Sequence, residues 1–463
     1  AAEGGEANAL REKAYRYRML RAVYSAGSRI TDEDLAAISA AVEGGGADGG
    51  GGGREPKQAP KYKELDAQGK LGAWVLVRIS APPDRKNAPN PEDRFEFEFC
   101  RLAHGVYSDA PDKLAFFKDL TAASACGRDG NRRRMRWAEA EEYLKKSRVV
   151  PPTAFIHHEA RCGSTLAINV LASNPRALAY SEPPPIVSAG ANLCRDCDWD
   201  FRVRLLRLAV NLMGVSDTAE YLFFKLMPIT VMHVELFQEA FPTTPNIWMH
   251  REPVEVMMSQ LVKQKGPNEN RYNQQVMMAM KRNPAMPGNN QEGAAQPRKQ
   301  DQILQRYRNK AAPCLRPLPQ AKEALDLRRD EDYASREDYC AVYLQQTCQA
   351  ALQGLQDDQY GLPVAYRKDL ANYLIDFLIP EYFGVDLEPV AKQRAINVSG
   401  GYSKASRGRG GDFKGDIEKK HDNAWRALKN SANKYVSQVY QDLVKLEEEK
   451  IALFKQTKNL ARP

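Results

Sequence analysis

The sequence contains no apolar run of about 18 residues or more, so it predicts no membrane-spanning helix. Its first residues, AAEGGEANALREKAYRYRML, also lack the apolar stretch of a secretory signal peptide. The chain starts with Ala and not with Met, as it would after removal of an upstream targeting or anchor segment. We therefore expect a soluble chain, and the sequence leaves the compartment open between the cytoplasm and an organelle lumen.

Residues that bind metals are few. There are six histidines and eight cysteines, and only two of the cysteines, Cys194 and Cys197, have the CxxC spacing. A zinc ribbon needs a second pair, which the sequence does not contain, so we expect no bound metal. A disulfide or two free thiols is the favoured interpretation of this pair, because an even number of cysteines permits disulfides without requiring them at this chain length.

A strong charge of one sign is also missing. The 67 basic and 59 acidic residues give a net charge of +8, which favours anionic ligands but is modest for 463 residues. Nucleic-acid-binding proteins concentrate basic charge more strongly, and no alternation of aromatic and basic residues indicates an RNA-binding sheet. We therefore expect no nucleic-acid partner, and the oligomeric state stays open.

The sequence does contain enough apolar side chains for a large core, since 43% of the residues are hydrophobic and 27% are charged. Residues 1–55 are the exception. Eight of the ten residues 44–53 are glycine, so we expect a flexible N-terminal segment with a glycine-rich linker. Residues 56–150 are expected to form a small α+β extension, with strands at 71–80 and 94–100 and a helix at 137–147.

From residue 151 onward, apolar strands alternate with amphipathic helices. The expected strands are 153–158, 221–225 and 246–250, and the expected helices are 199–213, 231–241 and 252–263. This alternation predicts an α/β fold, a three-layer P-loop-like domain whose central parallel sheet is flanked by helices. The domain is expected over 151–463, with a polar insertion at 264–335, helical periodicity at 337–354 and 366–379, and one long charged helix at 415–457.

The sharpest local feature is FIHHEARCGSTLAINVLA, residues 155–172, in which an apolar strand leads through a short loop into a helix. The N–H groups at a helix start and the helix dipole favour an anion. Gly163 lets the backbone approach a phosphate closely, and Arg161 adds positive charge. Ser164 and Thr165 can cap the helix and donate to phosphate oxygens.

The loop is not a Walker A motif, because the first Gly and the Lys before Ser/Thr are both missing. An ordinary capped helix after a strand is the alternative interpretation.

A second segment, NIWMHREPVEVMMSQL (246–261), places Arg251 directly after a strand and Ser259 two turns into the next helix. Pro253 fits near the helix start, where its missing N–H costs little. An Arg and a Ser placed in this way can both reach one phosphate. For each residue taken alone, a position on the protein surface is the alternative.

Together the two segments resemble the PAPS-dependent sulfotransferases, which have a P-loop-like fold and take a sulfuryl group from 3′-phosphoadenosine 5′-phosphosulfate (PAPS). Their first motif, often [KR]-[SA]-G-[ST]-T, binds the 5′ phosphosulfate and corresponds here to Arg161, Cys162, Gly163, Ser164 and Thr165. Their second motif binds the 3′ phosphate through an Arg and a Ser eight positions apart, which correspond to Arg251 and Ser259. The sequence departs from the family at Cys162, where a small polar residue is usual, and in the residues that follow Arg251.

A further part of the resemblance lies in SRGRGGDFKGD, residues 406–416, which is similar to the family's loop over the 3′ phosphate and adenosine. It implies that Arg407, Gly408 and Lys414 bind the donor, although Ser406 stands where the family has Arg. A mobile basic linker is the alternative interpretation of this glycine-rich segment.

Sulfuryl transfer needs a base for the acceptor proton and a cation for the leaving oxygen. Glu182 follows Arg161 by 21 positions, a spacing that resembles the loop Arg and catalytic Glu of the tyrosylprotein sulfotransferases. The resemblance makes Glu182 the base, whereas Lys225, at the end of the strand YLFFK, and Arg161 stabilise the leaving oxygen. His233 is a rival base. A salt-bridged Glu and an edge Lys are the alternatives, and the two histidines at 157–158 are expected to pack or brace the loop.

The sequence therefore predicts a sulfotransferase that uses PAPS as cosubstrate, needs no metal, and transfers to a hydroxyl or amine of a carbohydrate, a peptide or a small alcohol. A kinase-like nucleotide transferase is disfavoured, because the strands YLFFK and NIWMH end in Lys and His and not in the Asp of a Walker B motif. A non-catalytic protein that retains the fold is the other alternative.

Overall fold

The computed structural model describes residues 74–261, 313–325, 335–400 and 417–460, apart from short gaps at 83, 86–87, 103, 125, 127–130, 193, 195–196 and 317. The expected flexible segment 1–55, most of the insertion 264–335, and Arg407, Gly408 and Lys414 lie outside these residues.

Three antiparallel strands form a small sheet in the order β1-β2-β3 at the N-terminal end of the described chain. In β2 the phenylalanines Phe97 and Phe99 are fully buried whereas Glu96 and Glu98, which alternate with them, are half-buried, and this is the alternation that the sequence predicted for a half-exposed strand. The elements of this part are β1 (Val75–Ser80), η1 (Pro91–Arg94), β2 (Glu96–Cys100), α3 (His104–Asp109), α4 (Phe117–Ala123), β3 (Arg133–Arg136) and α5 (Trp137–Lys145).

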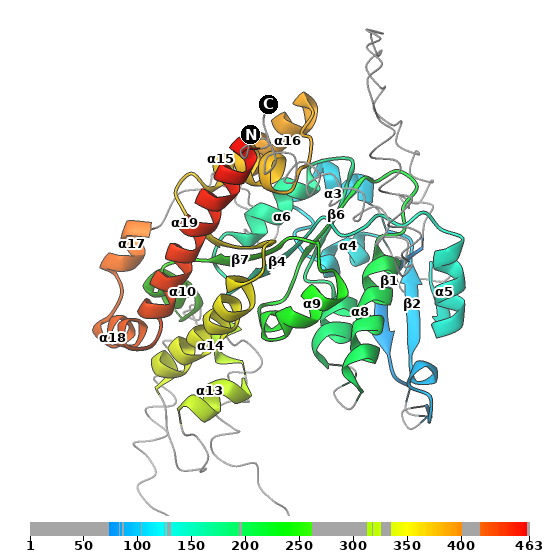
Figure 1. Ribbon diagram of the computed structural model, residues 1–463, viewed down its shortest axis with the longest axis horizontal. Coiled ribbons are helices and arrows are strands. Elements are labelled where there is room, and N and C mark those ends of the chain that lie inside the picture. Colours follow the sequence, from blue (N-terminus) through cyan, green and yellow to red (C-terminus); the bar gives the residue numbers. More distant parts are fainter. Residues whose placement is uncertain are drawn as a thin grey trace, which may run out of the picture.

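Five parallel strands form the main sheet in the order β5-β6-β4-β7-β8 (Figure 1). They are β4 (Ala154–His158), β5 (Ala177–Ser181), β6 (Tyr221–Lys225), β7 (Asn246–His250) and β8 (Gly361–Ala365). Every residue of β4, β5 and β7 is buried, as expected for a parallel sheet that is covered on both faces. The predicted α/β fold with a central parallel sheet flanked by helices is thus confirmed.

Helices α6 and α16 lie on one side of the sheet, and α9 and α14 lie on the other (Figure 1). The helices before the large gap are α6 (Ser164–Ala172), α7 (Pro184–Val187), η2 (Ser188–Asn192), α8 (Trp199–Met213), η3 (Pro228–His233), α9 (Val234–Ala240) and α10 (Pro253–Leu261). Those after it are η5 (Pro313–Leu315), α13 (Pro319–Ala324), α14 (Arg336–Gln356), α15 (Leu370–Tyr373), η6 (Leu374–Tyr382), α16 (Pro389–Ser399), α17 (Ile417–Asp422), α18 (Arg426–Tyr435) and α19 (Ser437–Leu460).

The prediction of one long helix at 415–457 is wrong, because this segment forms the three helices α17, α18 and α19. The chain bends at Val436, between α18 and α19, where φ is −111° and ψ is −30°, and Val436 is 1% exposed. Both α18 and α19 pack against α14.

The core consists of two apolar clusters. The larger one runs from the small antiparallel sheet through β4, β5 and β6 to η6, and the smaller one lies between α10, α14, α18 and α19. Three disulfides join Cys100 to Cys126, Cys194 to Cys197 and Cys314 to Cys340. The CxxC pair is therefore a disulfide, one of the two interpretations that the sequence favoured.

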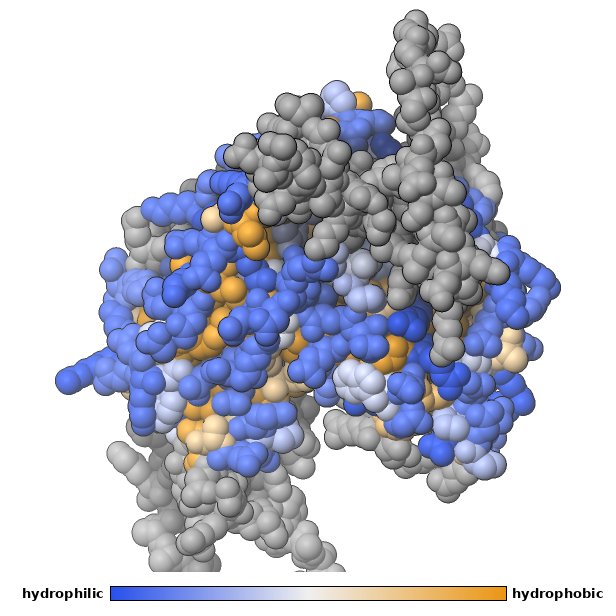
Figure 2. Space-filling model, in the orientation of Figure 1, coloured by the Kyte–Doolittle hydropathy of each residue, from blue (hydrophilic) through white to orange (hydrophobic). Residues whose placement is uncertain are grey.

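Hydrophilic side chains cover most of the face seen in Figure 2, and apolar atoms show between them along α19. Within the described ranges, no helix combines the length and the apolar character needed to cross a membrane.

Candidate functional site

The loop after β4 leaves the centre of the sheet in an unusual conformation. Ala160 and Arg161 have φ values of 67° and 61°, and Gly163 has a φ of 86°, so three of the four residues 160–163 are left-handed. Non-glycine residues avoid this region at a cost of about 1–2 kcal/mol each. Such strain persists only where the surroundings hold it, and it is frequent where a backbone cradles a ligand.

Gly163 is required at its position for steric reasons as well. A Cβ atom there would lie 2.6 Å from Cδ2 of Leu370 and 3.0 Å from Cδ2 of Tyr366. Helix α6 begins at Ser164, with Gly163 as its N-cap residue. The prediction that Ser164 or Thr165 caps this helix is therefore wrong. The backbone N–H groups of Ser164 and Thr165 lie in the first turn of α6, where the helix itself provides no carbonyl acceptors, so they can bind an anion.

Arg161 and Ser259 meet across the two segments that the sequence singled out. The Nε atom of Arg161 donates to Oγ of Ser259 over 2.7 Å, although 98 positions separate the two residues. Because β4 and β7 are neighbours, the loop after β4 and helix α10 after β7 lie at the same edge of the sheet. The candidate residues for the 5′ and 3′ groups of one ligand are thus adjacent.

Arg251 is buried, with 6% of its surface exposed, and its guanidinium is held on three sides. Its Nε atom donates to Oε2 of Glu255, and its NH1 atom donates to the carbonyl of Arg161 over 3.5 Å. Its Cζ atom lies 4.0 Å from the centre of the Tyr366 ring. An anion at this place therefore meets an oriented guanidinium, and it competes with the Glu255 carboxylate for it.

Glu182 and Lys225 form an ion pair between Oε1 and Nζ at the ends of β5 and β6. Lys225 is 1% exposed and also donates to Oγ of Ser181 over 3.4 Å. Its ammonium lies 5.3 Å from the centre of the Phe116 ring, so the N-terminal extension reaches this pair. Glu182 has a φ of 57°, a further left-handed residue at the same edge of the sheet.

His158, the last residue of β4, lies next to this pair. Its Nδ1 atom accepts a hydrogen bond of 2.9 Å from the N–H of Ala160, so in the neutral ring the proton is on Nε2. That Nε2 atom lies 3.6 Å from Oε1 of Glu182. Burial raises the pKa of Glu182, but Lys225 and His158 lower it more, and the result is a pKa well below the usual range.

The sequence predicted that His158 packs or braces the loop, and its bond to the N–H of Ala160 does brace the loop, but its contact with Glu182 was not predicted. The available signal was its place as the last residue of the strand before the loop. His157 does pack: Nε2 lies 3.3 Å from Oδ1 of Asn246, and burial lowers the pKa of its ring to about 4. His233, the rival base, is half-buried at the end of η3.

Cys162 is fully buried, and the structure therefore leaves only its backbone to face a ligand. Its side chain points toward the interior, where Cys348 of α14 is also buried as a free thiol. The departure from the small polar residue of the sulfotransferase motif is thus a packing feature.

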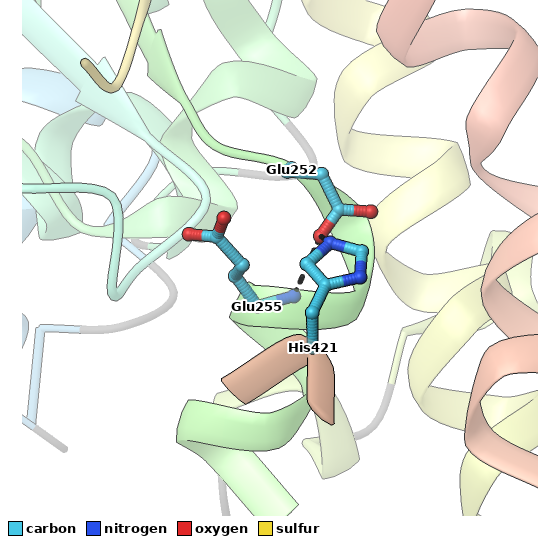
Figure 3. Close-up of side chains that lie close together, drawn as sticks. All are labelled: Glu252, Glu255 and His421. Carbon is cyan, nitrogen blue, oxygen red and sulfur yellow. Dashed lines mark hydrogen bonds and ion pairs between the residues drawn. The ribbon is translucent and has the colours of Figure 1, made fainter. Parts of the chain in front are cut away.

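Glu252, Glu255 and His421 lie close enough together to suggest a metal site, since one ligand atom of each falls within 4.8 Å of the others (Figure 3). Their contacts give another explanation. Oε2 of Glu252 accepts the N–H of Glu255 over 2.9 Å, which caps α10, and it lies 2.9 Å from Nε2 of His421. The Glu255 carboxylate accepts a hydrogen bond from Nε of Arg251, and in Figure 3 it points away from His421. Glu255 is therefore paired with Arg251, and Glu252 contacts the N–H of Glu255 and the His421 ring. The absence of a metal stays a prediction.

No model of a known protein family matches the chain, and no curated protein matches it in sequence. Among solved structures, the crystal structure of sulfotransferase STF9 from Mycobacterium avium aligns with a TM-score of 0.36 and 11% identity, over 71% of this chain and 83% of that chain. A likeness this distant assigns no activity.

Proposed function

We propose that this protein is a PAPS-dependent sulfotransferase that transfers a sulfuryl group to a hydroxyl or amine acceptor. The observation that carries the proposal is the meeting of Arg161 with Ser259 beside Arg251, because these residues came from two sequence motifs with separate assignments on one donor molecule. A shared packing role would explain one such contact. It would not explain why the loop is also left-handed and opens a helix.

The residues near the loop have the chemistry that the transfer needs. In the proposed reaction the acceptor oxygen attacks sulfur, the bond from sulfur to the bridging oxygen breaks, and adenosine 3′,5′-bisphosphate leaves. Glu182 takes the acceptor proton, and Lys225 with Arg161 stabilises the negative charge on the departing phosphate. Arg251 and Ser259 bind the 3′ phosphate.

In the structure, Lys225 is paired with Glu182. A carboxylate whose pKa is held far below neutrality is a poor base. In the proposed reaction the bound donor attracts the Lys225 ammonium, the ion pair weakens, and the pKa of Glu182 rises toward the range in which it accepts a proton. The tyrosylprotein-like spacing of Arg161 and Glu182 is compatible with this arrangement but does not identify the acceptor.

The test is calorimetric titration with adenosine 3′,5′-bisphosphate, which lacks the reactive sulfuryl group. We expect micromolar binding that does not depend on Mg²⁺ and that weakens by about tenfold or more in Arg251→Ala, since a charged hydrogen bond contributes about 1.5–3 kcal/mol. Arg207→Ala serves as the control, because the side chain of Arg207 donates to the carbonyls of Glu239 and Ala240 at the C-terminal end of α9.

Absence of binding to the wild-type protein, or equal binding of ATP with Mg²⁺, would reject the proposal and favour the kinase-like or the non-catalytic alternative. A positive result would justify a screen of acceptors with labelled PAPS across carbohydrates, peptides and small alcohols.

A further inference from the structure

Glu159 is the first residue after β4, and it lies where the hydrogen-bond ladder between β4 and β7 ends. The last paired residues are His158 and Met249, and the N–H of Glu159 still donates to the carbonyl of Met249 over 3.3 Å. Beyond this point the backbone turns left-handed at Ala160 and leaves the ladder. Arg251 is the first residue after β7, and its N–H donates to Oε1 of the Glu159 side chain over 2.5 Å and not to a backbone carbonyl of the loop.

The Glu159 side chain also joins this strand end to other elements. It is 2% exposed, and Oε2 lies 3.5 Å from Sγ of Cys348 on α14. The backbone carbonyl of Glu159 accepts from Nε2 of Gln260 on α10 over 3.4 Å. The buried carboxyl is thus held between the N–H of Arg251 and the thiol of Cys348, and this close packing restricts the backbone of Arg251.

The position of that backbone matters because the Arg251 guanidinium is oriented within the same small volume. Its NH1 atom reaches the carbonyl of Arg161 in the loop, and the guanidinium stacks over the Tyr366 ring. A shift of the Arg251 backbone moves the guanidinium relative to the loop. Misplacement by about 1 Å is enough to weaken a charged contact severely.

We infer that Glu159 is a positioning residue of the anion site: its buried side chain continues the β4–β7 ladder past the end of the backbone pairing and holds Arg251 against the phosphate-binding loop. This inference rests on the proposed function for its ligand. The contact between Glu159 and Arg251 does not depend on it.

The charge of Glu159 adds a measurable signature. The titratable and charged groups that face it are Arg251 and Glu252 after β7, Cys348 on α14 and Tyr440 on α19. Burial raises the pKa of Glu159 to about 8, and the hydrogen bond from Arg251 opposes the rise. Burial also raises the pKa of Tyr440 to about 12 and that of Cys348 well above its usual value, so neither thiol nor phenol ionises between pH 7 and about pH 9.

As the pH rises through 8, the Glu159 carboxyl becomes negative beside the guanidinium. Phosphate monoesters lose their second proton near pH 6, so the ligand keeps its charge over this range. A new negative charge at Glu159 therefore weakens anion binding as the pH rises.

The experiment compares Glu159→Gln and Glu159→Leu with the wild-type protein by titration with adenosine 3′,5′-bisphosphate at pH 7 and pH 9. Gln keeps the acceptor oxygen and cannot ionise. We expect Glu159→Gln to match the wild-type Kd within about twofold at pH 7 and to lose the weakening at pH 9. We expect Glu159→Leu, which lacks the acceptor, to bind about tenfold more weakly at pH 7.

The matched control is Glu447→Gln. Glu447 is another buried glutamate whose carboxyl accepts a strand-end N–H, that of Ala365, the last residue of β8, over 2.9 Å. Burial raises the pKa of Glu447, as it raises that of Glu159, but Glu447 lies on α19 and binds the end of a different strand. Its substitution should leave both the Kd at pH 7 and the pH dependence within about twofold of wild type.

A readout without ligand separates this inference from the proposed function. Amide hydrogen exchange at Arg251 should be faster in Glu159→Leu than in wild type, and unchanged in Glu159→Gln. If the wild-type protein does not bind the bisphosphate, the proposed function fails, and the exchange rates alone decide whether Glu159 holds Arg251. Equal protection in all three proteins overturns the inference, as does equal loss of binding in the Gln and Leu variants. Should Glu159→Leu not fold, an unchanged pH dependence in Glu159→Gln overturns it.

Discussion

Nε of Arg161 donates to Oγ of Ser259 over 2.7 Å, and this hydrogen bond joins the loop after β4 to the helix after β7. In a parallel sheet the carboxyl ends of neighbouring strands form one edge, so two segments that are far apart in the chain build one anion site. The same edge holds the Glu182–Lys225 pair at the ends of β5 and β6. The proposed anion-binding residues and the Glu182–Lys225 pair thus lie at the ends of four adjacent strands, β5, β6, β4 and β7.

Replacement of the proposed base should separate catalysis from binding. We expect Glu182→Gln to lower kcat by about 10²–10⁴-fold, the usual contribution of a general base, and to leave the Kd for adenosine 3′,5′-bisphosphate within about threefold. His233→Gln is the comparison, since His233 was the rival base. Steady-state kinetics with an identified acceptor provide the measurement, and a larger loss of kcat in His233→Gln would transfer the role to His233.

The Glu182 carboxyl should also make stability depend on pH. Its pKa is lower in the folded protein than the value of about 4.3 for an unfolded chain, because of Lys225 and His158. A group of this kind contributes stability that is present above the unfolded pKa and is lost as the pH falls toward the folded pKa. We therefore expect wild type to be more stable than Glu182→Gln at pH 7, and the difference in the free energy of unfolding to shrink below about pH 4.

Urea denaturation of the two proteins between pH 7 and pH 3 measures this difference. Lys225→Met should abolish most of it, because the lysine supplies the main attraction. A difference that stays constant with pH would show that Glu182 is not ionised in the folded protein.

Gly163 tests the shape of the loop. An alanine there must adopt a φ of 86° and bring its Cβ atom within 2.6 Å of Leu370, so Gly163→Ala should lower the free energy of unfolding by about 2–3 kcal/mol and weaken anion binding. Gly384→Ala is the matched control. Gly384 has a φ of 63° but no atom within 4 Å of its added Cβ, so only the conformational cost of about 1 kcal/mol should remain. Equal losses in the two variants would mean that Leu370 and Tyr366 move aside easily.

The disulfides should differ in their contributions according to the loops that they close. Removal of the Cys100–Cys126 pair, with a separation of 26 residues, should cost about 3.5 kcal/mol by the loop-entropy model. Removal of the Cys194–Cys197 pair, with a separation of 3, should cost about 2 kcal/mol. Double Cys→Ser variants and urea denaturation provide the measurement, and the opposite ranking would contradict the model.

Local sequence patterns gave the strands β4, β6 and β7 with bounds that differ from the structure by at most one residue. These strands are short apolar runs with clear ends, and Pro253 marks the start of the helix after β7. The fifth strand, β8, was not predicted. Its sequence GLPVA has a Gly and a Pro within five residues, which argue against a strand when the sequence is considered alone. Pro363 is tolerated because β8 has only one neighbour within the sheet.

The sequence by itself determined the strand–loop–helix after residue 154 and the position of Arg251 after a strand, because both follow from hydrophobic periodicity and from turn chemistry over a few residues. Only the tertiary structure decided which side chains meet. The contacts of His158 with Glu182, of Glu182 with Lys225 and of Glu159 with Arg251 join residues from different strands. They depend on the strand order and on the left-handed turn of the loop, and no local pattern specifies either of these.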